Sequence, residues 1–415
     1  MTATANGAPP SVPAFLHPFA RPAAESSSFV RIVGGKGARV WDDQGNTYID
    51  AMASLWYCAV GHGRPEMAEA IARQAGTLGG YQCFDRFTNE PADALAERIA
   101  SIAPVPGSRV FFTAGGSEAV DTALKLVRLA HVLRGDPGRT IVISRAPSYH
   151  GSAYGSTALT GLPPNQLGFG PGVPDVVQVP KDDSEAVRAI FEQHAGRVAA
   201  VFAEPIIGAA GVYPPHPGYL QELRRLCDEH GACLVLDEVI TGFGRLGQWF
   251  AGQFYGVRAD LTTFAKAVTS GYIPLGGVIV APSVHEVLAA DPAFILRHGF
   301  TYSGHPTACA AGLACLDIIE RESLLSRPSV IGNALRPGLE ALVSDGVVAS
   351  FRGEMGVWAV ELHPGQDVAA ARDRLLDAGI VVRPIPPATI AMCPPFVIGA
   401  DELGQILAAL RSALA

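Results

Sequence analysis

The chain has 415 residues, of which 48% are hydrophobic and 17% charged, and it carries a formal net charge of −8. These values are typical of a folded protein with a sizeable core, and they exclude disordered and fibrous chains. The charge is spread without a basic stripe and no apolar run reaches the ~20 residues that span a bilayer, so we expect no nucleic-acid or membrane partner.

The N-terminal segment, MTATANGAPPSVPAF, lacks the cationic and apolar regions of a signal peptide. We expect it to be a disordered lead-in to a cytoplasmic protein. The seven cysteines are scattered and never form a CxxC pair, which predicts neither a disulfide framework nor a metal site. Residues 38–50 predict a hairpin around an Asp-Gln-Gly-Asn turn, and residues 65–74 begin a helix.

From residue 109 to 230, short apolar runs alternate with helical stretches at 118–134 and 218–230. Four runs, RVFFTAG, TIVISR, VAAVFAEPI and ACLVLDEV, are too apolar for strands with one exposed face. They predict an α/β fold in which helices cover both faces of a mostly parallel sheet.

After about residue 312 the pattern changes to a helix, two short strands, a helix at 368–378, a strand (GIVVRPI) and a terminal helix. A segregated order of this kind is typical of an α+β unit. We therefore expect a separate, smaller α+β domain.

Small and polar residues follow the carboxyl ends of the predicted strands. Ligands of open parallel sheets bind beyond these ends. The candidates there are Gly115 to Ser117, Tyr149, His150, Glu204 and Asp237.

A glycine turn joins a strand to a helix in RVFFTAGGSEAVDTALKLVR. The backbone N–H groups of Gly116 and Ser117 would lie at the helix N-terminus, where the dipole favours an anion, and the Ser117 hydroxyl adds a donor. Such a turn alone is weak evidence, because many are only connections. The motif is neither a GxGxxG turn nor a Walker loop, and it predicts a phosphate site.

The segment APSYHGS follows the next predicted strand. Tyr149 is placed to stack on a flat ring, and Gly151 allows a close approach of the backbone; the alternative for Tyr149 is an ordinary core aromatic. Val239, two residues beyond Asp237, is placed to press on the opposite face of the ring.

Two further segments carry the chemistry. LVLDEVITGFGR places Asp237 at the end of a strand, and TFAKAVTSGYIPLGG places Lys266 alone among small and apolar residues. A pyridoxal phosphate (PLP) enzyme needs both groups: the lysine forms the Schiff base, and the carboxylate keeps the pyridine nitrogen protonated so that the ring accepts electrons. Separately, the two residues are also compatible with a loop cap and a surface lysine.

Six segments in order resemble the class III (ω-) aminotransferases of PLP fold type I: SEAVDTALKLVR, YHGS, EPI with its following G and AG, LDEVITGFGR, the Lys266 segment and GFTYSGHPTACAAGLA. The resemblance covers nearly the whole chain from about residue 17. It implies a large domain with a seven-stranded sheet at residues 56–305, and a small domain formed by residues 1–55 and 306–415.

The resemblance also implies residue roles. Lys266 binds PLP covalently and moves the proton, and Asp237 pairs with the ring nitrogen. Thr301 binds the phosphate of the neighbouring subunit's cofactor, which implies a homodimer, with a tetramer as the alternative. The cofactor-binding residues implied are Gly116, Ser117, Tyr149, His150, Gly151, Glu204, Asp237, Val239, Lys266 and Thr301.

Differences from the ornithine and 4-aminobutyrate aminotransferases indicate which substrate subgroup to expect. Those relatives show EPIQGE and a glutamine in DE-[V/I]-QTG, where this chain has Ile207, Ala209 and Ile240. Their glutamate, at the position of Ala209, neutralises an active-site arginine, so its absence favours the amine or ω-amino acid:pyruvate subgroup. Arg383 in GIVVRPI would then bind the keto-acid carboxylate, although Phe396 replaces the usual leucine nearby; the alternative for Arg383 is a surface strand.

Three aromatic residues resemble the walls of the family's substrate pocket. Trp56 resembles a wall residue, and Phe19 and Phe84 resemble aromatics supplied largely by the partner chain. Such walls favour a flat or aliphatic amine over a strongly charged one.

Three alternatives to a pyruvate-dependent transaminase stay open. One is an aminomutase or racemase on the same scaffold, and another is a transaminase that uses 2-oxoglutarate or S-adenosylmethionine. The third is a structural or regulatory protein without activity, which the joint presence of Lys266, Asp237 and the phosphate residues disfavours.

Overall fold

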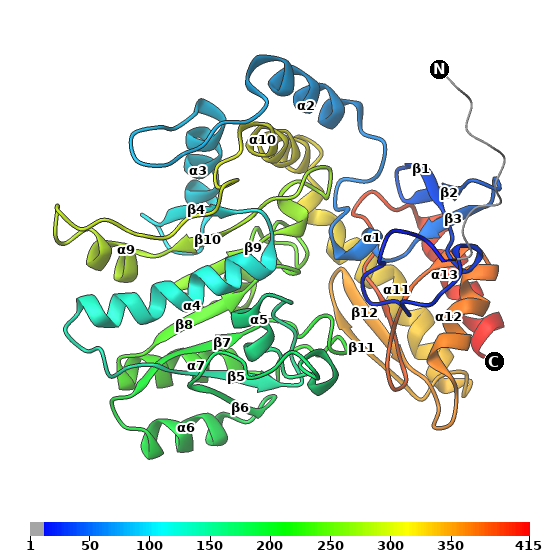
Figure 1. Cartoon of the computed structure of the whole chain (residues 1–415). Coiled ribbons are helices and arrows are strands. Elements are labelled where there is room, and N and C mark those ends of the chain that lie inside the picture. The colour runs from blue at the N-terminus through cyan, green and yellow to red at the C-terminus, as the bar shows by residue number, and fades with distance from the viewer. Residues whose placement is uncertain (1–11) are drawn as a thin grey trace.

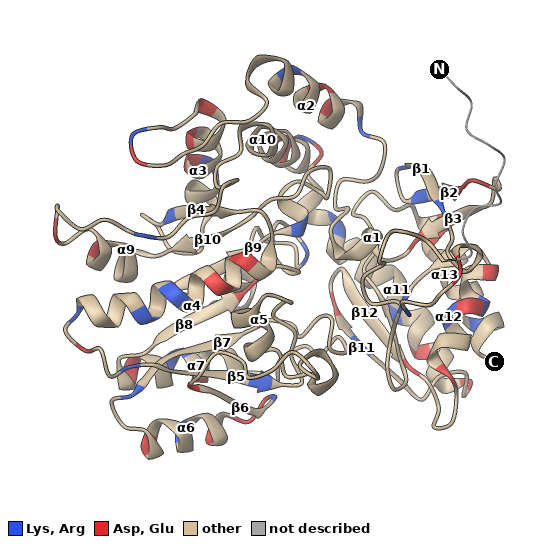
Figure 2. Ribbon diagram, in the orientation of Figure 1, with Lys and Arg blue, Asp and Glu red and all other residues tan. Residues whose placement is uncertain are grey.

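The structure, a computed structural model, describes residues 12–415; most of the predicted lead-in lies outside the described residues. A large part is built on a seven-stranded sheet, and a smaller part on two four-stranded sheets lies beside it (Figure 1). Figure 2 shows acidic and basic residues interspersed over both parts. No helix of residues 12–415 is long and apolar enough to cross a membrane.

The large sheet has the strand order β4-β10-β9-β8-β7-β5-β6. Only β10 runs antiparallel to its neighbours, so the predicted mostly parallel sheet is confirmed. Strands β6, β9 and β10 were not among the predicted runs. The bounds are β4 Arg109–Thr113, β5 Ile141–Ala146, β6 Val176–Pro180, β7 Val198–Ala203, β8 Cys233–Asp237, β9 Leu261–Phe264 and β10 Gly276–Val280.

Helices cover both faces of this sheet because its strands are apolar on both sides. Val142 and Val235 share a core with α4 (Gly116–Leu133), whereas their neighbours Ile143 and Leu234 share another with α7 (Tyr219–His230). The other helices of this part are α2 Pro65–Leu78, α3 Glu90–Ile102, α5 Tyr154–Leu159, α6 Ser184–Gln193, α8 Ala251–Tyr255, α9 Pro282–Leu288 and α10 Pro306–Arg321. The short helix α1 (Ala53–Trp56) lies against the smaller part, where Trp56 clusters with Val357 and Ile385.

The smaller part contains two sheets, β1-β2-β3-β13 and β11-β12-β15-β14. Their bounds are β1 Ile32–Lys36, β2 Arg39–Asp42, β3 Thr47–Asp50, β11 Ser350–Glu354, β12 Val357–Glu361, β13 Ile380–Val381, β14 Arg383–Ile385 and β15 Thr389–Met392. Helices α11 (Arg327–Ser344), α12 (Val368–Asp377) and α13 (Ala400–Leu414) pack on them. Short 3₁₀ turns are η1 Ser26–Ser28, η2 Pro163–Asn165, η3 Lys266–Val268 and η4 Leu324–Ser326.

The single strand predicted for GIVVRPI is wrong. Ile380 pairs in parallel with β3, whereas Arg383 pairs antiparallel with β15 in the other sheet, so the chain changes sheets at Val382. Pro384 has no N–H to donate to a continuous ladder, which is consistent with its place on the edge strand β14.

The domain boundaries at residues 55/56 and 305/306 stay predictions. The pairing of β3 with β13 joins the two ends of the chain in one sheet. Helix α10, beyond the second predicted boundary, packs against α2 and α3, and its Ala311 and Cys315 lie in the same core as Leu95.

Candidate active site

The carboxyl ends of four strands meet at one edge of the large sheet, as the parallel order requires. Gly116 and Ser117 follow β4, Tyr149 and His150 follow β5, Glu204 follows β7, and Asp237 ends β8. The site is therefore assembled from residues distant in sequence by the alignment of the strands.

Asp237 is held by a histidine and a threonine. Its Oδ2 lies 2.7 Å from Nδ1 of His150, and its Oδ1 accepts hydrogen bonds from the Thr263 hydroxyl at 3.0 Å and the Val239 backbone N–H at 3.2 Å. Asp237 is only 5% exposed and His150 3%. A carboxylate that is buried and accepts three hydrogen bonds in this way has a fixed position.

Lys266 lies at the start of η3 with a left-handed backbone (φ 48°) and a half-buried side chain. Burial lowers the pKa of Lys266, and the carboxylates of Asp237 and Glu204 only partly oppose this effect. No hydrogen bond or ion pair holds its amine within residues 12–415. An unpaired amine with a lowered pKa gives up its proton more readily, and its neutral form can act as a nucleophile and as a base.

The predicted phosphate site is a narrow turn between two backbone segments. The Ser117 hydroxyl accepts a hydrogen bond from the Ser152 N–H at 3.0 Å. Gly151 has φ 132°, and a Cβ on it would lie 2.5 Å from Ser117 Oγ; a Cβ on Gly116 would lie 2.9 Å from Val239 Cγ1. Gly151 needs glycine because of its positive φ and these contacts, Gly116 leaves no room for a Cβ unless Val239 moves, and the α4 N-terminus beside them provides N–H groups for an anion.

Glu204 fixes the Tyr149 segment. Its two carboxylate oxygens accept hydrogen bonds from the backbone N–H groups of Tyr149 and Gly208, both at 2.9 Å, and Arg145 binds its backbone carbonyl. Glu204 is 4% exposed, and burial raises the pKa of its carboxyl group. The contacts are those of a residue that positions its neighbours.

Arg383 approaches the site from β14 of the smaller part. Burial lowers the pKa of Arg383, while the nearby Tyr149 hydroxyl opposes this effect, so the two side chains lie within electrostatic reach. No acidic side chain of residues 12–415 forms an ion pair with Arg383. Its half-buried guanidinium therefore differs from the surface arginine of the alternative interpretation.

The predicted pocket residues occupy different surroundings. Trp56 is 2% exposed and packs in a cluster with Ile240 and Ile385. Ile385 follows Arg383 by two positions on β14. Ala209 is half-buried in the loop closed by the Ile207–Tyr213 bridge.

Phe19 and Phe84 lie on separate surfaces. Phe19 is 75% exposed and lines a pocket with Gly151 and Ser152 of its own chain. Phe84 lies close to Gly299, where an added Cβ would be 3.1 Å from its ring, two residues before the exposed Thr301. Within the described residues, neither Phe84 nor Thr301 forms a hydrogen bond with Lys266.

The comparisons with known proteins agree with one another. Residues 21–414 match the family model of class III aminotransferases. The chain belongs to the class III aminotransferases. A β-alanine–pyruvate aminotransferase of Pseudomonas aeruginosa is 35% identical, covering 92% of this chain and 91% of the relative. An acetylornithine aminotransferase of Mycobacterium bovis is 37% identical over 93% and 92%. A thermostable ω-transaminase from Pseudomonas jessenii superimposes with a TM-score of 0.92, 33% identity and 96% coverage of both chains.

Class III aminotransferases depend on PLP, and the residues of this aminotransferase fit that cofactor. The predicted phosphate site is too tight for a Cβ at Gly151, the amine of Lys266 is unpaired, and the carboxylate of Asp237 is fixed by two side chains. A phosphate, an aldehyde and a ring nitrogen need these three features.

Sequence reasoning missed two buried polar residues near Asp237 of this aminotransferase. Thr263, on the unrecognised strand β9, bonds to Asp237; only strand pairing reveals this contact. Glu238, next to Asp237, is fully buried and accepts hydrogen bonds from the N–H groups of Ala251 and Gly252. Its place in the sequence beside a candidate residue was the available signal.

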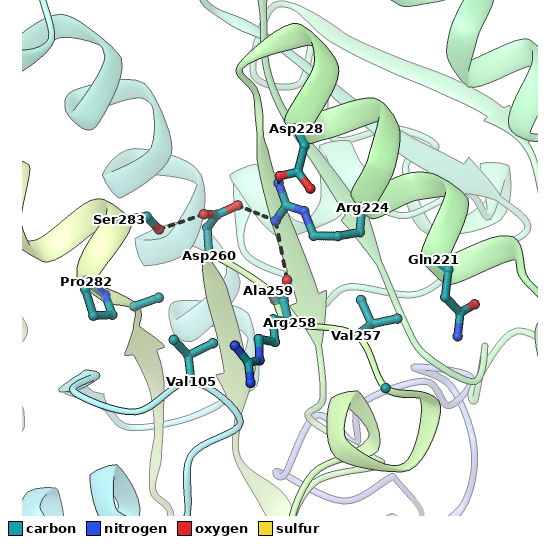
Figure 3. A pocket seen from close by; sticks show the side chains of 12 residues that line it. Val105, Gln221, Arg224, Asp228, Val257, Arg258, Ala259, Asp260, Pro282 and Ser283 are labelled. Carbon is teal, nitrogen blue, oxygen red and sulfur yellow. Dashed lines mark hydrogen bonds and ion pairs between the residues drawn. The ribbon is translucent and has the colours of Figure 1, made fainter.

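A second pocket of the aminotransferase lies on the opposite edge of the large sheet (Figure 3). There Asp260, directly before β9, accepts hydrogen bonds from Arg224 and Ser283, both at 2.7 Å. Arg224 also forms an ion pair with Asp228 at 2.7 Å, so both carboxylates of this pocket are paired with the same arginine. Within residues 12–415 no group of three or more His, Cys, Asp and Glu side chains could hold a metal ion.

Proposed function

We propose that this aminotransferase moves an amino group from a primary amine or ω-amino acid to pyruvate by a ping-pong reaction. The observation that carries the proposal is the half-buried Arg383, which has no acidic partner among the described residues and lies within electrostatic reach of Tyr149. An unpaired guanidinium in a partly dry site binds a carboxylate strongly, and pyruvate presents one next to its carbonyl group.

Ala209 supports this choice of acceptor and donor. In the loop where ornithine-type relatives have a glutamate, this chain has a methyl group, so no carboxylate competes for Arg383 from there. The names of the β-alanine–pyruvate aminotransferase and the ω-transaminase point the same way. The acetylornithine aminotransferase, at similar identity, shows that overall similarity alone does not select a substrate.

Each residue around Asp237 and Lys266 has a distinct proposed role. PLP, when bound, supplies an aldehyde and an electron-withdrawing ring. Lys266 attaches to the cofactor and moves a proton at the substrate carbon, which its lowered pKa favours. Asp237 keeps a proton on the ring nitrogen, and His150 and Thr263 keep Asp237 in place.

The remaining predicted residues complete the proposed site. Gly116, Ser117 and Gly151 hold the phosphate, Tyr149 and Val239 enclose the ring, and Glu204 positions Tyr149. Trp56, Phe19, Phe84 and Ala209 shape the substrate pocket. We place Thr301 and Phe84 in the site of a second subunit, because both lie exposed beside one another, and we propose a cytoplasmic homodimer.

The test is a titration of the PLP-loaded protein followed by visible absorption. A simple primary amine should bleach the band of the lysine-bound cofactor, and pyruvate should restore it. Restoration by 2-oxoglutarate but not by pyruvate would overturn the acceptor. Turnover of a single substrate without any keto acid would identify an isomerase, and the absence of any band after addition of PLP would refute the role of Lys266.

A further inference from the structure

Arg245 is a buried cation in the loop that follows Asp237. It is 1% exposed, and no acidic side chain of residues 12–415 forms an ion pair with it. Burying an arginine without a counter-ion is unfavourable unless its N–H groups find other acceptors. The contacts that Arg245 makes therefore indicate what the position requires.

Those contacts all lie in the C-terminal segment of the chain, between Gly356 and Phe396. Arg245 Nη1 donates to the backbone carbonyl of Pro394 at 2.7 Å and, more weakly, to that of Gly356 at 3.4 Å. Its guanidinium lies over the Phe396 ring, with Cζ 4.5 Å from the ring centroid. A cation on an aromatic face is favourable in a site from which water is excluded, and Phe396 is 0% exposed.

Phe396 is itself firmly held. Its backbone N–H donates to Ala59 at 2.9 Å, and its carbonyl accepts from Arg327 at 3.0 Å. A Cβ on Gly244, beside Arg245, would lie 3.0 Å from the Phe396 ring. The aromatic residue that departs from the leucine of the family motif is thus the face on which Arg245 rests.

The segment to which Arg245 donates its hydrogen bonds is continuous with β15, the strand that pairs with the strand of Arg383. Pro394 follows β15, and Ala391 on β15 is the register partner of Arg383 on β14. Cys393, next to Pro394, lies within electrostatic reach of Lys266. Arg245 thus links the loop that starts at Asp237 to the hairpin that carries Arg383.

We propose that Arg245, resting on Phe396, is a positioning residue that sets the place of Arg383 relative to the Asp237 and Lys266 centre, and so the affinity for the substrate carboxylate. This inference rests on the proposed function, in which Arg383 binds the keto acid. Arg245, the arginine of the GFGR segment, would thus affect binding of the substrate carboxylate through Arg383, although Arg245 itself touches neither substrate nor cofactor.

The experiment compares Arg245→Met, Arg245→Lys and the milder Phe396→Leu with wild type. The control is Arg336→Met, because Arg336 also lies over an aromatic ring, that of Trp358 at 5.0 Å, but is exposed on α11. For each PLP-loaded protein we would measure the dissociation constant of propionate by calorimetry and the rates of the amine and pyruvate half-reactions. Propionate reports on carboxylate binding without any chemistry.

We expect Arg245→Met to weaken propionate and pyruvate binding about tenfold, because a displaced cation loses its aligned contact, while the rate constant with amine stays within about twofold. Arg245→Lys and Phe396→Leu should have intermediate effects, and Arg336→Met none. Unchanged propionate binding, or equal losses in both half-reactions, would overturn the inference. If no keto acid restores the absorption band of the amine-treated wild-type protein, the proposed function is wrong and the role of Arg245 is not the cause.

Discussion

His150 and Asp237, from the ends of two strands, meet through Nδ1 and Oδ2 at 2.7 Å, and both side chains are almost fully buried. The pair turns the carboxylate into a fixed group, since Thr263 holds the other oxygen at 3.0 Å. A group that must face one ring nitrogen needs this restraint, because a mobile carboxylate would find other partners.

Removing either partner of Asp237 should weaken catalysis. We expect His150→Phe to lower kcat/KM about 10- to 100-fold, the equivalent of one lost hydrogen bond to a buried charge, and Thr263→Val to have a smaller effect. Thr262→Val is the control, because Thr262 lies on the same strand but does not bond to Asp237. Steady-state kinetics with an amine and pyruvate would measure these losses. Activity near wild type in His150→Phe would contradict the role of His150 in holding Asp237.

Lys266→Ala should retain PLP without a covalent bond and lose amino transfer almost completely. The chain has four lysines, Lys36, Lys125, Lys181 and Lys266, so reduction with borohydride and peptide mass spectrometry can locate the attachment. We expect modification of Lys266 alone, and none in the variant. Attachment at another lysine, or turnover near wild type, would refute the assignment, and Lys125→Ala serves as the control.

Gly151→Ala should disturb the predicted phosphate site. The added Cβ would lie 2.5 Å from Ser117 Oγ and 2.9 Å from Ser156 Oγ, at a φ of 132°. We expect the dissociation constant of PLP to rise at least about tenfold, which a spectroscopic titration measures. Gly196→Ala is the matched control: it also has a positive φ, 73°, but nothing lies within 4 Å of the added Cβ. It should lose about 1 kcal/mol of stability and no PLP affinity.

The stability of the protein should depend on pH through Glu238. Burial raises the pKa of Glu238 from 4.5 to about 7, although hydrogen bonds to two backbone N–H groups oppose the effect. The folded state therefore binds more protons between these values, and the free energy of unfolding should fall by up to about 3 kcal/mol as the pH rises through this range.

Glu238→Gln should remove most of this slope, while adding a constant loss of about 1–3 kcal/mol for a mispaired N–H. Urea unfolding between pH 5 and pH 8 provides the measurement, with the exposed Glu286→Gln as control. A slope unchanged by Glu238→Gln would place its origin in another group.

Arg383→Ala separates the two half-reactions. Because the lost guanidinium would bind only a carboxylate, we expect the apparent affinity for pyruvate to fall about 10- to 100-fold, while bleaching by a simple amine proceeds as in wild type. Stopped-flow absorption resolves the two steps. Equal losses in both would mean that Arg383 supports the site in general.

The sequence predicted much of the large sheet, because four strands are apolar on both faces and end in small or polar residues. It failed where local pattern and pairing differ. Strand β9 contains two threonines and looked unremarkable, yet it carries Thr263 to Asp237. GIVVRPI was continuous in its apolar pattern, but its two halves pair in different sheets.

By itself, the sequence determined the residue types that the chemistry needs and the strand ends that carry them. Apolar runs and the turn residues that end them are local properties of the chain. The tertiary structure alone decided which groups meet. The contacts of Asp237 with His150 and Thr263, and of Arg245 with Pro394 and Phe396, join separate segments. Such contacts depend on how strands align and on how the two parts pack, and no spacing along the chain encodes these distances directly.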